Sequence, residues 1–469
     1  MIIWGYITIL GYIFGLIFLL GPIVQKASNT ETSRKIIHSM LFAVWVFIDI
    51  FFRDTIHQIL IAVVFLILNT LSFKFKIYKS VEREDDNHLG TVYFAIAITV
   101  IMTVAYFRPE FFPCTGIATF CLTFGDGTAA LAGKGIKSPA LRSSKSLAGF
   151  WGCMTSSLVT LLIFEAFYNT ELTFWSILSI ALIAAISELV EKGLDNFSVV
   201  AGTSLLAWLY TASNIEISPF SILIAEAIFL VVFLSGSIDY WGSTLSMLIV
   251  FSFSLFGGII SLMFLLAMYF LIFFVALYKK CIAHKREDSH RRSFLQILLN
   301  GGFGLVFMLL YGLTKKSSYL LISIIAIGGC FVDSLSSDIG ELSAVDPYDV
   351  FKGTIVQRGM SGGMSLLGTT AALLGSVGVG AATYYALKFS LSSSLLASVL
   401  IFSQTLVDSA FGSLLQAKYR CAKCGKLTEK ANHCGAKSTL ISGYAWMDNN
   451  MVNLFSSTII TAVAWLVMR

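Results

Sequence analysis

The sequence predicts an all-α, polytopic integral membrane protein with about sixteen transmembrane helices in two weakly similar modules. Of its 469 residues, 57% are apolar and only 13% are charged, whereas a soluble domain has roughly 45–50% apolar and about 25% charged residues. A bilayer core needs about 20 apolar residues for each helical span, and apolar runs near that length recur along the whole chain. This composition excludes a soluble enzyme.

Each predicted span is an apolar run bounded by polar or charged residues. The first eight cover residues 2–24, 36–52, 58–73, 90–107, 112–125, 148–168, 173–190 and 197–213. The second eight cover residues 219–235, 242–256, 258–278, 298–313, 318–332, 364–387, 390–412 and 450–467. The runs 112–125 and 242–256 are short enough to be re-entrant or broken helices, because a full span needs about 20 residues.

The basic residues test this division into spans, because Lys and Arg collect in cytoplasmic loops. All but six of the 32 Lys and Arg residues fall in alternate loops. The six on the other side are Arg53, Arg108, Lys315, Lys316, Lys388 and Arg469. The sequence therefore places the basic side in the cytoplasm and both termini outside. The net charge of +5 then reflects topology in a lipid bilayer, and we expect no nucleic acid partner.

The chain also shows a weak internal repeat. It divides into two modules of eight predicted spans each, residues 1–215 and 216–469. Each module has a Gly/Ser loop with a basic residue, at 145–149 and 358–363, and each closes on the pattern D-N-x-x-V, which starts at Asp195 and Asp448. Because these signals recur in the same order and on the same side, we interpret the modules as related units fused in one chain.

Acidic residues of the first module lie at the predicted ends of spans, where they suit a divalent cation. Mg²⁺ is held by one or two carboxylates plus substrate phosphates, basic side chains neutralise phosphate charge, and glycines let backbone N–H groups approach phosphate oxygens. The predicted Mg²⁺ ligands are Asp126, Glu188 and Asp195. The predicted phosphate or nucleotide contacts are Arg34, Lys35, Gly125, Gly127, Arg142 and Asn196. The alternative is that the glycines pack helices and the charges lie at the bilayer interface.

A histidine and a lysine complete the predicted catalytic set of this module. His38 follows Arg34 at i+4 in the pattern R-K-x-x-H, so both lie on one helix face. His38 is either an acid/base group or phosphate ligand, or a histidine that makes an interfacial hydrogen bond. The predicted catalytic residues are His38, Asp126, Lys145 and Asp195.

The second module has a corresponding set at the same predicted membrane face. A glycine turn at 358–363 opens a span and thereby combines free backbone donors with a helix N-terminus. The predicted catalytic residues are Asp333, Arg358, Asp408 and Asp448, and the predicted Mg²⁺ ligands are Asp333, Asp338, Asp408 and Asp448. The predicted nucleotide contacts are Asn300, Gly359, Ser361, Gly362, Gly363, Asn449 and Asn453. The alternative is a glycine-rich turn with ordinary helix caps.

Three of the eight cysteines lie in one basic loop, 421–434. Cys421 and Cys424 have the spacing of a zinc knuckle, and His433 and Cys434 follow as further ligands of a structural Zn²⁺. Simultaneous ligation by the adjacent His433 and Cys434 requires backbone strain. Reduced thiols without metal and a disulfide are the alternatives, and a reducing cytoplasm disfavours the disulfide.

These motifs resemble two families of membrane kinases. The segments RKIIH, GDGTAALAGKG, RSSKSLAG and the E-x6-DN close, within residues 30–205, resemble the dolichol kinase and phytol kinase family. The segments RRSFLQILLNGG, RGMSGGMSLLGT, DSAFGSLLQ and DNNMVNLFSS, together with the loop 333–340, resemble the family that includes phytyl-phosphate kinase. The second match spans about 285–460 and departs from that family at Ser334, where Thr is usual, and at Asp338, where Glu is usual.

The resemblance implies a bifunctional phosphotransferase. The first family phosphorylates a long-chain isoprenoid alcohol, usually with CTP, and the second converts the monophosphate to a diphosphate. The alcohol must lose a proton, so the first module needs a base, for which Asp126 and Asp195 are the candidates. The alternative class is a transporter of an anionic or lipid substrate, which predicts polar residues near the bilayer midplane. Glu226 is the one strong example of such a residue.

Overall fold

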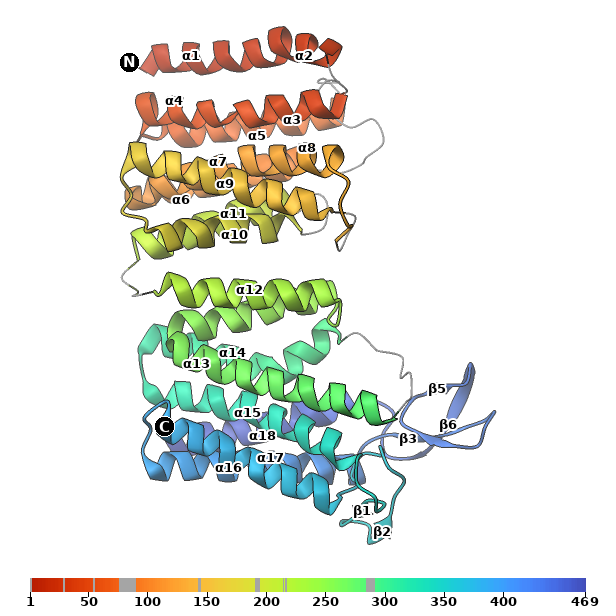
Figure 1. Cartoon of the computed structure of the whole chain (residues 1–469). Helices are drawn as coiled ribbons and strands as arrows, with labels where there is room; N and C mark the ends of the chain where they lie inside the picture. The colour runs from red at the N-terminus through yellow and green to blue at the C-terminus, as the bar shows by residue number, and fades with distance from the viewer. Residues whose placement is uncertain are drawn as a thin grey trace. The chain divides into compact units, whose positions relative to one another are not determined.

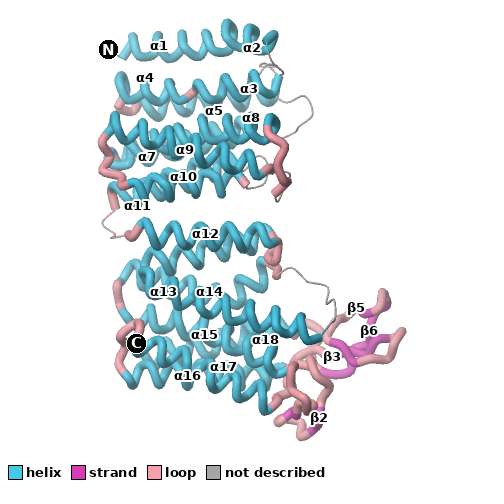
Figure 2. Tube along the Cα trace, in the orientation of Figure 1, coloured by secondary structure: helices cyan, strands magenta, loops and turns pink. Residues whose placement is uncertain are grey.

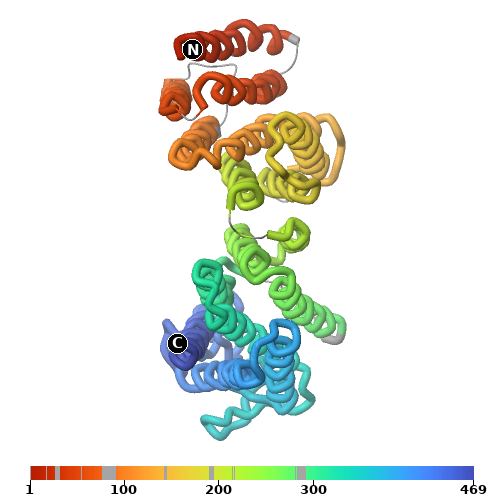
Figure 3. Tube along the Cα trace, turned by 90° about the vertical axis from the view of Figure 1, so that its left-hand side faces the viewer, coloured from red at the N-terminus to blue at the C-terminus, as the bar shows by residue number. Residues whose placement is uncertain are grey.

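The computed structural model describes residues 2–27, 30–53, 55–75, 90–141, 145–189, 195–213, 215, 217–283 and 292–469. The chain forms two compact units, Met1–Glu226 (unit 1) and Ala227–Arg469 (unit 2). The division falls inside one helix, eleven residues beyond the predicted boundary at 215. Each unit consists of helices that run side by side, as the view along their axes shows (Figure 3).

The regular secondary-structure elements of unit 1 are all helices among its described residues (Figure 1). Its helices are α1 (Ile2–Phe14), η1 (Gly15–Leu20), α2 (Gly21–Ala27), α3 (Thr30–Met40), α4 (Phe42–Phe52), α5 (His57–Phe75), α6 (Gly90–Phe107), η2 (Pro109–Phe111), α7 (Phe112–Phe120), η3 (Cys121–Asp126), α8 (Gly127–Gly135), α9 (Leu147–Tyr168), α10 (Phe174–Glu188) and α11 (Asp195–Thr211). Helix α12 (Pro219–Ser235) crosses the division between the units.

Unit 2 combines helices with two small sheets. Its helices are α13 (Tyr240–Ala283), α14 (Phe294–Thr314), α15 (Ser317–Gly340), α16 (Leu366–Tyr385), α17 (Leu391–Leu414) and α18 (Asn449–Met468). Its strands are β1 (Tyr348–Asp349), β2 (Thr354–Ile355), β3 (Lys418–Cys421), β4 (Leu427–Thr428), β5 (Asn432–His433) and β6 (Ala436–Ser442). Strands β1 and β2 pair antiparallel, and the others form a sheet in the order β4-β3-β6-β5. All of them lie beyond one end of the helices of unit 2 (Figure 2).

The predicted spans coincide with helices, and the membrane-protein class is confirmed. Among the described residues, ten helical stretches are long and apolar enough to cross a bilayer, and three shorter apolar helices accompany them. The total of sixteen spans stays a prediction. The predicted runs 242–256 and 258–278 both lie in α13, which is kinked at Gly258, where φ is 69°. A glycine at that position permits the left-handed backbone.

The short run 112–125 forms the buried centre of unit 1 rather than a re-entrant loop. Helices α7, η3 and α8 follow one another without a break, and α7 contacts α4, α6, α9 and α11. Small residues permit this close packing, since a Cβ atom at Gly116 would lie 2.5 Å from the Trp45 ring. A π-helical turn, η3, ends at Asp126, and such turns occur frequently at functional sites.

Helix α15 occupies the same central place in unit 2. It contacts α13, α14, α16, α17 and α18, and most of its residues from 320 to 335 are buried. Gly328 and Gly329 allow α17 to approach, because Cβ atoms there would meet Ile401 and Gln404. The C-terminal end of α15 therefore emerges from the core beside α16 and α17, and this end carries the polar residues of the site.

Candidate functional site

In unit 1, two residues that the sequence assigns to different tasks form a buried ion pair. Lys35 on α3 donates to both carboxylate oxygens of Asp126, each over 2.5 Å. The two residues are only 6% and 8% exposed. Helices α3 and α8 meet closely at Gly127, where a Cβ atom would collide with the Ser39 hydroxyl. Lys35, predicted as a phosphate contact, instead supplies the counter-charge of Asp126.

His38 faces the same carboxylate from the next turn of α3. Its Nε2 lies 3.6 Å from Asp126 Oδ2, and its ring packs against Phe94 with ring centroids 5.2 Å apart. This nitrogen is buried and has no hydrogen-bond partner among the described residues. The structure thus brings His38 and Asp126 together, as the sequence predicts, and leaves one ring nitrogen for another group.

A second ion cluster lies at the ends of α9, α10 and α11. Lys145 Nζ lies 2.5 Å from Glu188 Oε1 and 3.0 Å from Asp195 Oδ2. Burial lowers the pKa of Lys145, but the charges of Glu188 and Asp195 outweigh burial and raise it overall. Asp126 interacts electrostatically with both Lys145 and Glu188, so the two clusters belong to one charged site. The second oxygen of Glu188, Oε2, is buried without a hydrogen-bond partner among the described residues.

The glycines of this site pack helices. A Cβ atom at Gly125 would lie 2.9 Å from Ser157 Oγ and 3.0 Å from Cys153 Sγ, so Gly125, like Gly127, lets neighbouring helices approach. This packing agrees with the alternative interpretation of these glycines, and their role as phosphate contacts stays a prediction. Asn196 lies in the first turn of α11, where its backbone N–H donates to Asp195 Oδ1 over 3.0 Å. The predicted contact Arg142 lies outside the described residues.

Unit 2 contains a cavity of about 380 Å³ at the end of α15. Ten of the predicted residues line it or its rim, and they come from α15, the glycine turn, α17 and α18. These are Asp333, Asp338, Arg358, Gly359, Ser361, Gly362, Gly363, Asp408, Asn449 and Asn453. Glu341, which was not predicted, lines it as well. Asn300 and Asp448 do not line it. The cavity also has apolar lining from Met364, Ala372, Phe402 and Leu406.

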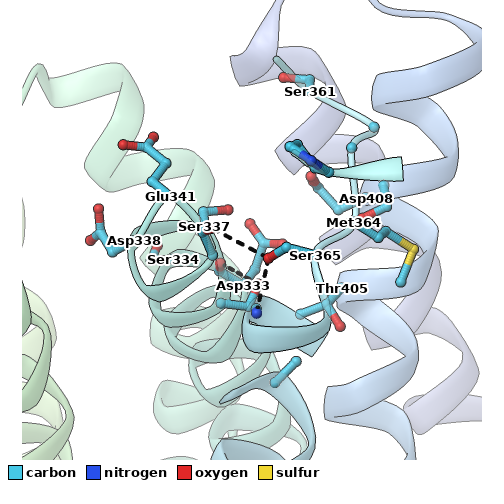
Figure 4. Close-up of a pocket in the computed structure, with 18 of the residues that line it drawn as sticks. Asp333, Ser334, Ser337, Asp338, Glu341, Ser361, Met364, Ser365, Thr405 and Asp408 are labelled. Atoms are coloured by element: carbon cyan, nitrogen blue, oxygen red, sulfur yellow. Dashed lines mark hydrogen bonds between the residues drawn. The ribbon is translucent and has the colours of Figure 1, made fainter. Parts of the chain in front are cut away.

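Two carboxylates from different helices face this cavity (Figure 4). The Asp333 carboxylate on α15 makes no hydrogen bond or ion pair with any residue that the structure describes. Asp408 Oδ1 on α17 accepts a hydrogen bond from Ser456 Oγ over 3.1 Å. With its amide nitrogen turned toward Asp408, Asn453 donates to the same oxygen over 3.1 Å. Like charges on a partly buried surface are costly without a cation.

Asp338 occupies a different side of α15. It lies together with Glu341, away from Asp333 (Figure 4), and Lys279 of α13 pairs with both of them at 3.0 and 2.6 Å. The prediction that Asp338 holds Mg²⁺ beside Asp333 stays a prediction, and in the structure its carboxylate has a cationic partner in Lys279. The sequence did not predict Lys279 as a site residue. It lies at the end of an apolar span, where a lysine ordinarily marks the bilayer interface.

The glycine turn 358–363 is held at the cavity by residues distant in sequence. Gly359 and Gly362 have φ of 80° and 85°, which only glycine adopts readily. Their backbone N–H groups donate to no residue in the described part of the chain. The N–H of Ser361, in contrast, donates to Glu429 Oε1 over 2.7 Å. The N–H of Ser361 is therefore already bonded within the protein. In this turn, the N–H groups of Gly359 and Gly362 remain for a phosphate.

Two further groups complete the rim. Arg358 pairs with Asp346 at 3.0 Å and donates to Ala344 O, with its side chain 45% exposed. Ser365 caps the N-terminus of α16, where its hydroxyl accepts from the N–H of Gly368 over 3.1 Å. Ser365 lines the cavity as well. A serine three residues before a glycine is too common a pattern to reveal this position in the sequence.

Asp448 has a structural task that the D-N-x-x-V pattern does not reveal. Its carboxylate accepts the N–H of Met451 over 2.9 Å and so caps α18. The structure places this carboxylate at a helix cap outside the cavity, and the predicted catalytic and Mg²⁺-binding roles of Asp448 stay predictions. Because Asn and Asp cap helices about equally well, we expect Asp448→Asn to keep wild-type activity within about twofold and stability within about 0.5 kcal/mol. Thermal unfolding and activity of the purified variant check this; a large activity loss at unchanged stability would return Asp448 to the site.

The Cys/His loop brings its four predicted ligands together. Cys421, Cys424, His433 and Cys434 each offer one ligand atom, and these atoms all lie within 4.8 Å of one another. The cysteines are free thiols. Backbone N–H groups, Cys424 first, and the side chain of His433 lower the pKa of the Cys421 thiol to about 6.

Comparison with known proteins identifies the membrane class of the second unit. No solved structure matches this chain. A family model described as integral membrane protein DUF92 matches residues 223–461, which is more than half of the chain and includes every residue that lines the cavity of unit 2. The match supports the predicted integral membrane character. The chain belongs to the DUF92 family of integral membrane proteins.

Proposed function

We propose that this protein is a two-step isoprenoid kinase. Unit 1 would phosphorylate an isoprenoid alcohol, and unit 2 would phosphorylate the resulting monophosphate to the diphosphate, with CTP or another nucleoside triphosphate as donor. The observation that carries the proposal is the cavity of unit 2, where Asp333 and Asp408 face the glycine turn 358–363. The isoprenoid substrate comes from the resemblance of both halves to kinases of that pathway.

The donor set of the cavity fits Mg²⁺. The Asp333 carboxylate has no hydrogen-bond or ion-pair partner among the described residues, and Asp408 lines the same cavity, which matches the one or two carboxylates that usually hold this ion. When bound, Mg²⁺ would supply positive charge that neutralises the charge developing during phosphoryl transfer. Asp333 and Asp408 would hold it, and Ser456 and Asn453 would orient Asp408.

Backbone donors at the other wall suit phosphate groups. Gly359 and Gly362 present N–H groups that no described residue accepts, and the N-terminus of α16 begins at the same wall, capped by Ser365. A helix N-terminus with free N–H groups favours anions. Arg358 at the rim would release Asp346 or share its charge with a phosphate, because its guanidinium offers five donors.

The shape of the cavity also suits an acceptor with an apolar tail. Met364, Ala372, Phe402 and Leu406 line it beside the polar groups, and the last three belong to α16 and α17, both candidate membrane spans. An isoprenoid chain would lie along these side chains while its phosphate faces Asp333. The acceptor is already anionic, so unit 2 needs charge neutralisation and positioning more than a base.

Unit 1 has the groups that an alcohol acceptor requires. Both oxygens of Asp126 accept from Lys35, which keeps this carboxylate ionised and makes it a poor base. His38 Nε2 lies beside Asp126 without another hydrogen-bond partner among the described residues. We assign His38 as the group that takes the hydroxyl proton onto Nε2, with Asp126 stabilising the resulting positive charge. The buried Glu188 Oε2 fits one bond to Mg²⁺.

Both sites would face the cytoplasm, where nucleoside triphosphates are available. The motif-bearing loops fall on the side that carries most basic residues, and the positive-inside rule assigns that side to the cytoplasm. The isoprenoid tails would remain in the bilayer.

The full-length protein, purified in detergent, tests the proposal directly. CTP and ATP labelled at the γ-phosphate are offered with Mg²⁺ to a panel of isoprenoid alcohols and their monophosphates. We expect the labelled phosphate to appear in the lipid products and to be absent from them when excess EDTA removes Mg²⁺. Both steps should prefer isoprenoids of a particular chain length. Absence of lipid labelling with every nucleotide, together with uptake of an anion by vesicles containing the protein, would replace the kinase by a transporter.

A further inference from the structure

We infer that Cys421, Cys424, His433 and Cys434 bind one structural Zn²⁺, and that the sheet built around this ion fixes the glycine turn 358–363. The ligand atoms are already gathered: His433 Nδ1 lies 3.5 Å from Cys424 Sγ and 3.3 Å from Cys434 Sγ. In a tetrahedral zinc site with bonds of about 2.0–2.3 Å, ligand atoms are roughly 3.5–4 Å apart. Small movements would therefore complete the coordination.

The backbone conformation allows the adjacent residues His433 and Cys434 to ligate the same ion. Cys434 has φ of 53°, in the left-handed region, and Gly435 follows with φ of 70°. This turn aims both Cys434 and His433 at the same point. On the other side, Gly425 with φ of 70° closes the turn after Cys424, and the Cys421 thiol donates to the backbone carbonyl of His433 over 3.5 Å.

The ligand types select zinc. Three thiols and one imidazole suit a soft, tetrahedral ion such as Zn²⁺ and exclude the hard, oxygen-preferring Mg²⁺. The alternative pairing of two cysteines in a disulfide would leave the third thiol and His433 without a common partner, whereas all four ligand atoms lie within 4.8 Å.

The four-stranded sheet around this cluster is too small to be held by its own core. Few of its apolar side chains are buried, Tyr419 and Cys421 among them, whereas Leu427, Leu440 and Ile441 are exposed. A segment of this size usually needs a metal or disulfide to be stable. Zinc binding would therefore supply much of the folding free energy of residues 418–442.

This sheet, with the residue that follows β4, holds the glycine turn through both backbone polar groups of Ser361. Glu429 Oε1 accepts the N–H of Ser361 over 2.7 Å, and Lys418 Nζ donates to the carbonyl of Ser361 over 2.9 Å. Gln416 fixes the other oxygen of Glu429 over 2.9 Å. Loss of the metal should therefore loosen residues 359–363, far along the chain from the ligands.

Metal analysis of the full-length protein and hydrogen exchange test the two parts of this inference. We expect about one zinc per chain in the parent, and its loss in Cys424→Ser and Cys434→Ser. The hydrogen-bonded amides of this turn, those of Met360, Ser361 and Gly363, should exchange at least about tenfold faster in these variants. Cys281→Ser, which removes an exposed cysteine outside the cluster, should keep both the zinc and slow exchange.

A further variant separates metal binding from its effect on the turn. Glu429→Gln should keep zinc and still speed exchange at residues 359–363, because the amide is a weaker acceptor than the carboxylate. Release of zinc from the unmodified chain by a thiol reagent should speed hydrogen exchange of the glycine turn in the same way. This experiment tests the coupling even if the cysteine variants fail to fold. Absence of zinc in the parent overturns the site. Zinc loss with unchanged exchange of the turn overturns the coupling. Neither measurement needs nucleotide, so failure of the kinase proposal would leave this inference standing.

Discussion

Asp333→Asn is expected to lower conversion of isoprenoid monophosphate to diphosphate by at least about 100-fold, or about 2.7 kcal/mol in transition-state stabilisation. The carboxylate faces the cavity of unit 2 without a partner in the described part of the chain. Its removal therefore deprives a cation of a ligand and breaks no hydrogen bond or ion pair among those residues. The substitution is nearly isosteric, so unfolding temperature should change little or increase, since a repulsion with Asp408 is relieved.

The assay follows labelled isoprenoid through both steps. With the alcohol as substrate, this variant should accumulate monophosphate, because unit 1 is untouched. Asp448→Asn is the matched control, since it makes the same chemical change in the same unit at a helix cap outside the cavity. Wild-type diphosphate formation by Asp333→Asn would remove Asp333 from the metal site and, with it, the main support for a kinase in unit 2.

The helices were predictable because hydrophobic length is a property of the sequence alone. A run such as 219–235 is predominantly apolar and therefore predicts an apolar helix whatever its neighbours are, and α12 covers those same residues. For the run 112–125, the sequence predicted only that it is too short for a full span. Its burial depends on Trp45 and the small residues that face it, and these contacts link segments about 70 residues apart.

The partners of charged residues could not be predicted in the same way. The motif places Lys35 near phosphate-binding residues, but its ion pair with Asp126 depends on how α3 crosses α8. Lys279 and Asp338 likewise meet only because α13 lies beside α15. A sequence motif shows which types of side chain a site contains. Which of these side chains form ion pairs with one another can be predicted only when the arrangement of the helices is known.

The small sheets of unit 2 were missed for a different reason. Strands β1, β2, β4 and β5 have two residues each, too few for an alternating pattern to be read. The sheet nevertheless brings Glu429 to Ser361. The cysteine spacing was the one available signal for it, since a metal knuckle organises short strands without needing a hydrophobic pattern.

Asp126→Asn is expected to reduce phosphorylation of the isoprenoid alcohol by at least about 1,000-fold, because the charge that supports His38 and neutralises Lys35 is lost. The same change leaves a lysine buried at 6% exposure without its counter-charge. Breaking a buried ion pair from one side costs roughly 3–5 kcal/mol. The variant is therefore expected to be less stable as well as inactive in the first step.

A double variant separates these two effects. In Asp126→Asn with Lys35→Gln, the two amides replace the ion pair, so stability should return to within about 1 kcal/mol of the parent. First-step activity should remain lost, whereas conversion of added monophosphate in unit 2 should be normal in both variants. Glu110→Gln serves as the control for loss of one negative charge in unit 1, since this residue lies in an exposed pair with Arg108. If the double variant regains first-step activity together with stability, Asp126 is a structural partner of Lys35, and the proton acceptor must lie elsewhere than the His38–Asp126 pair.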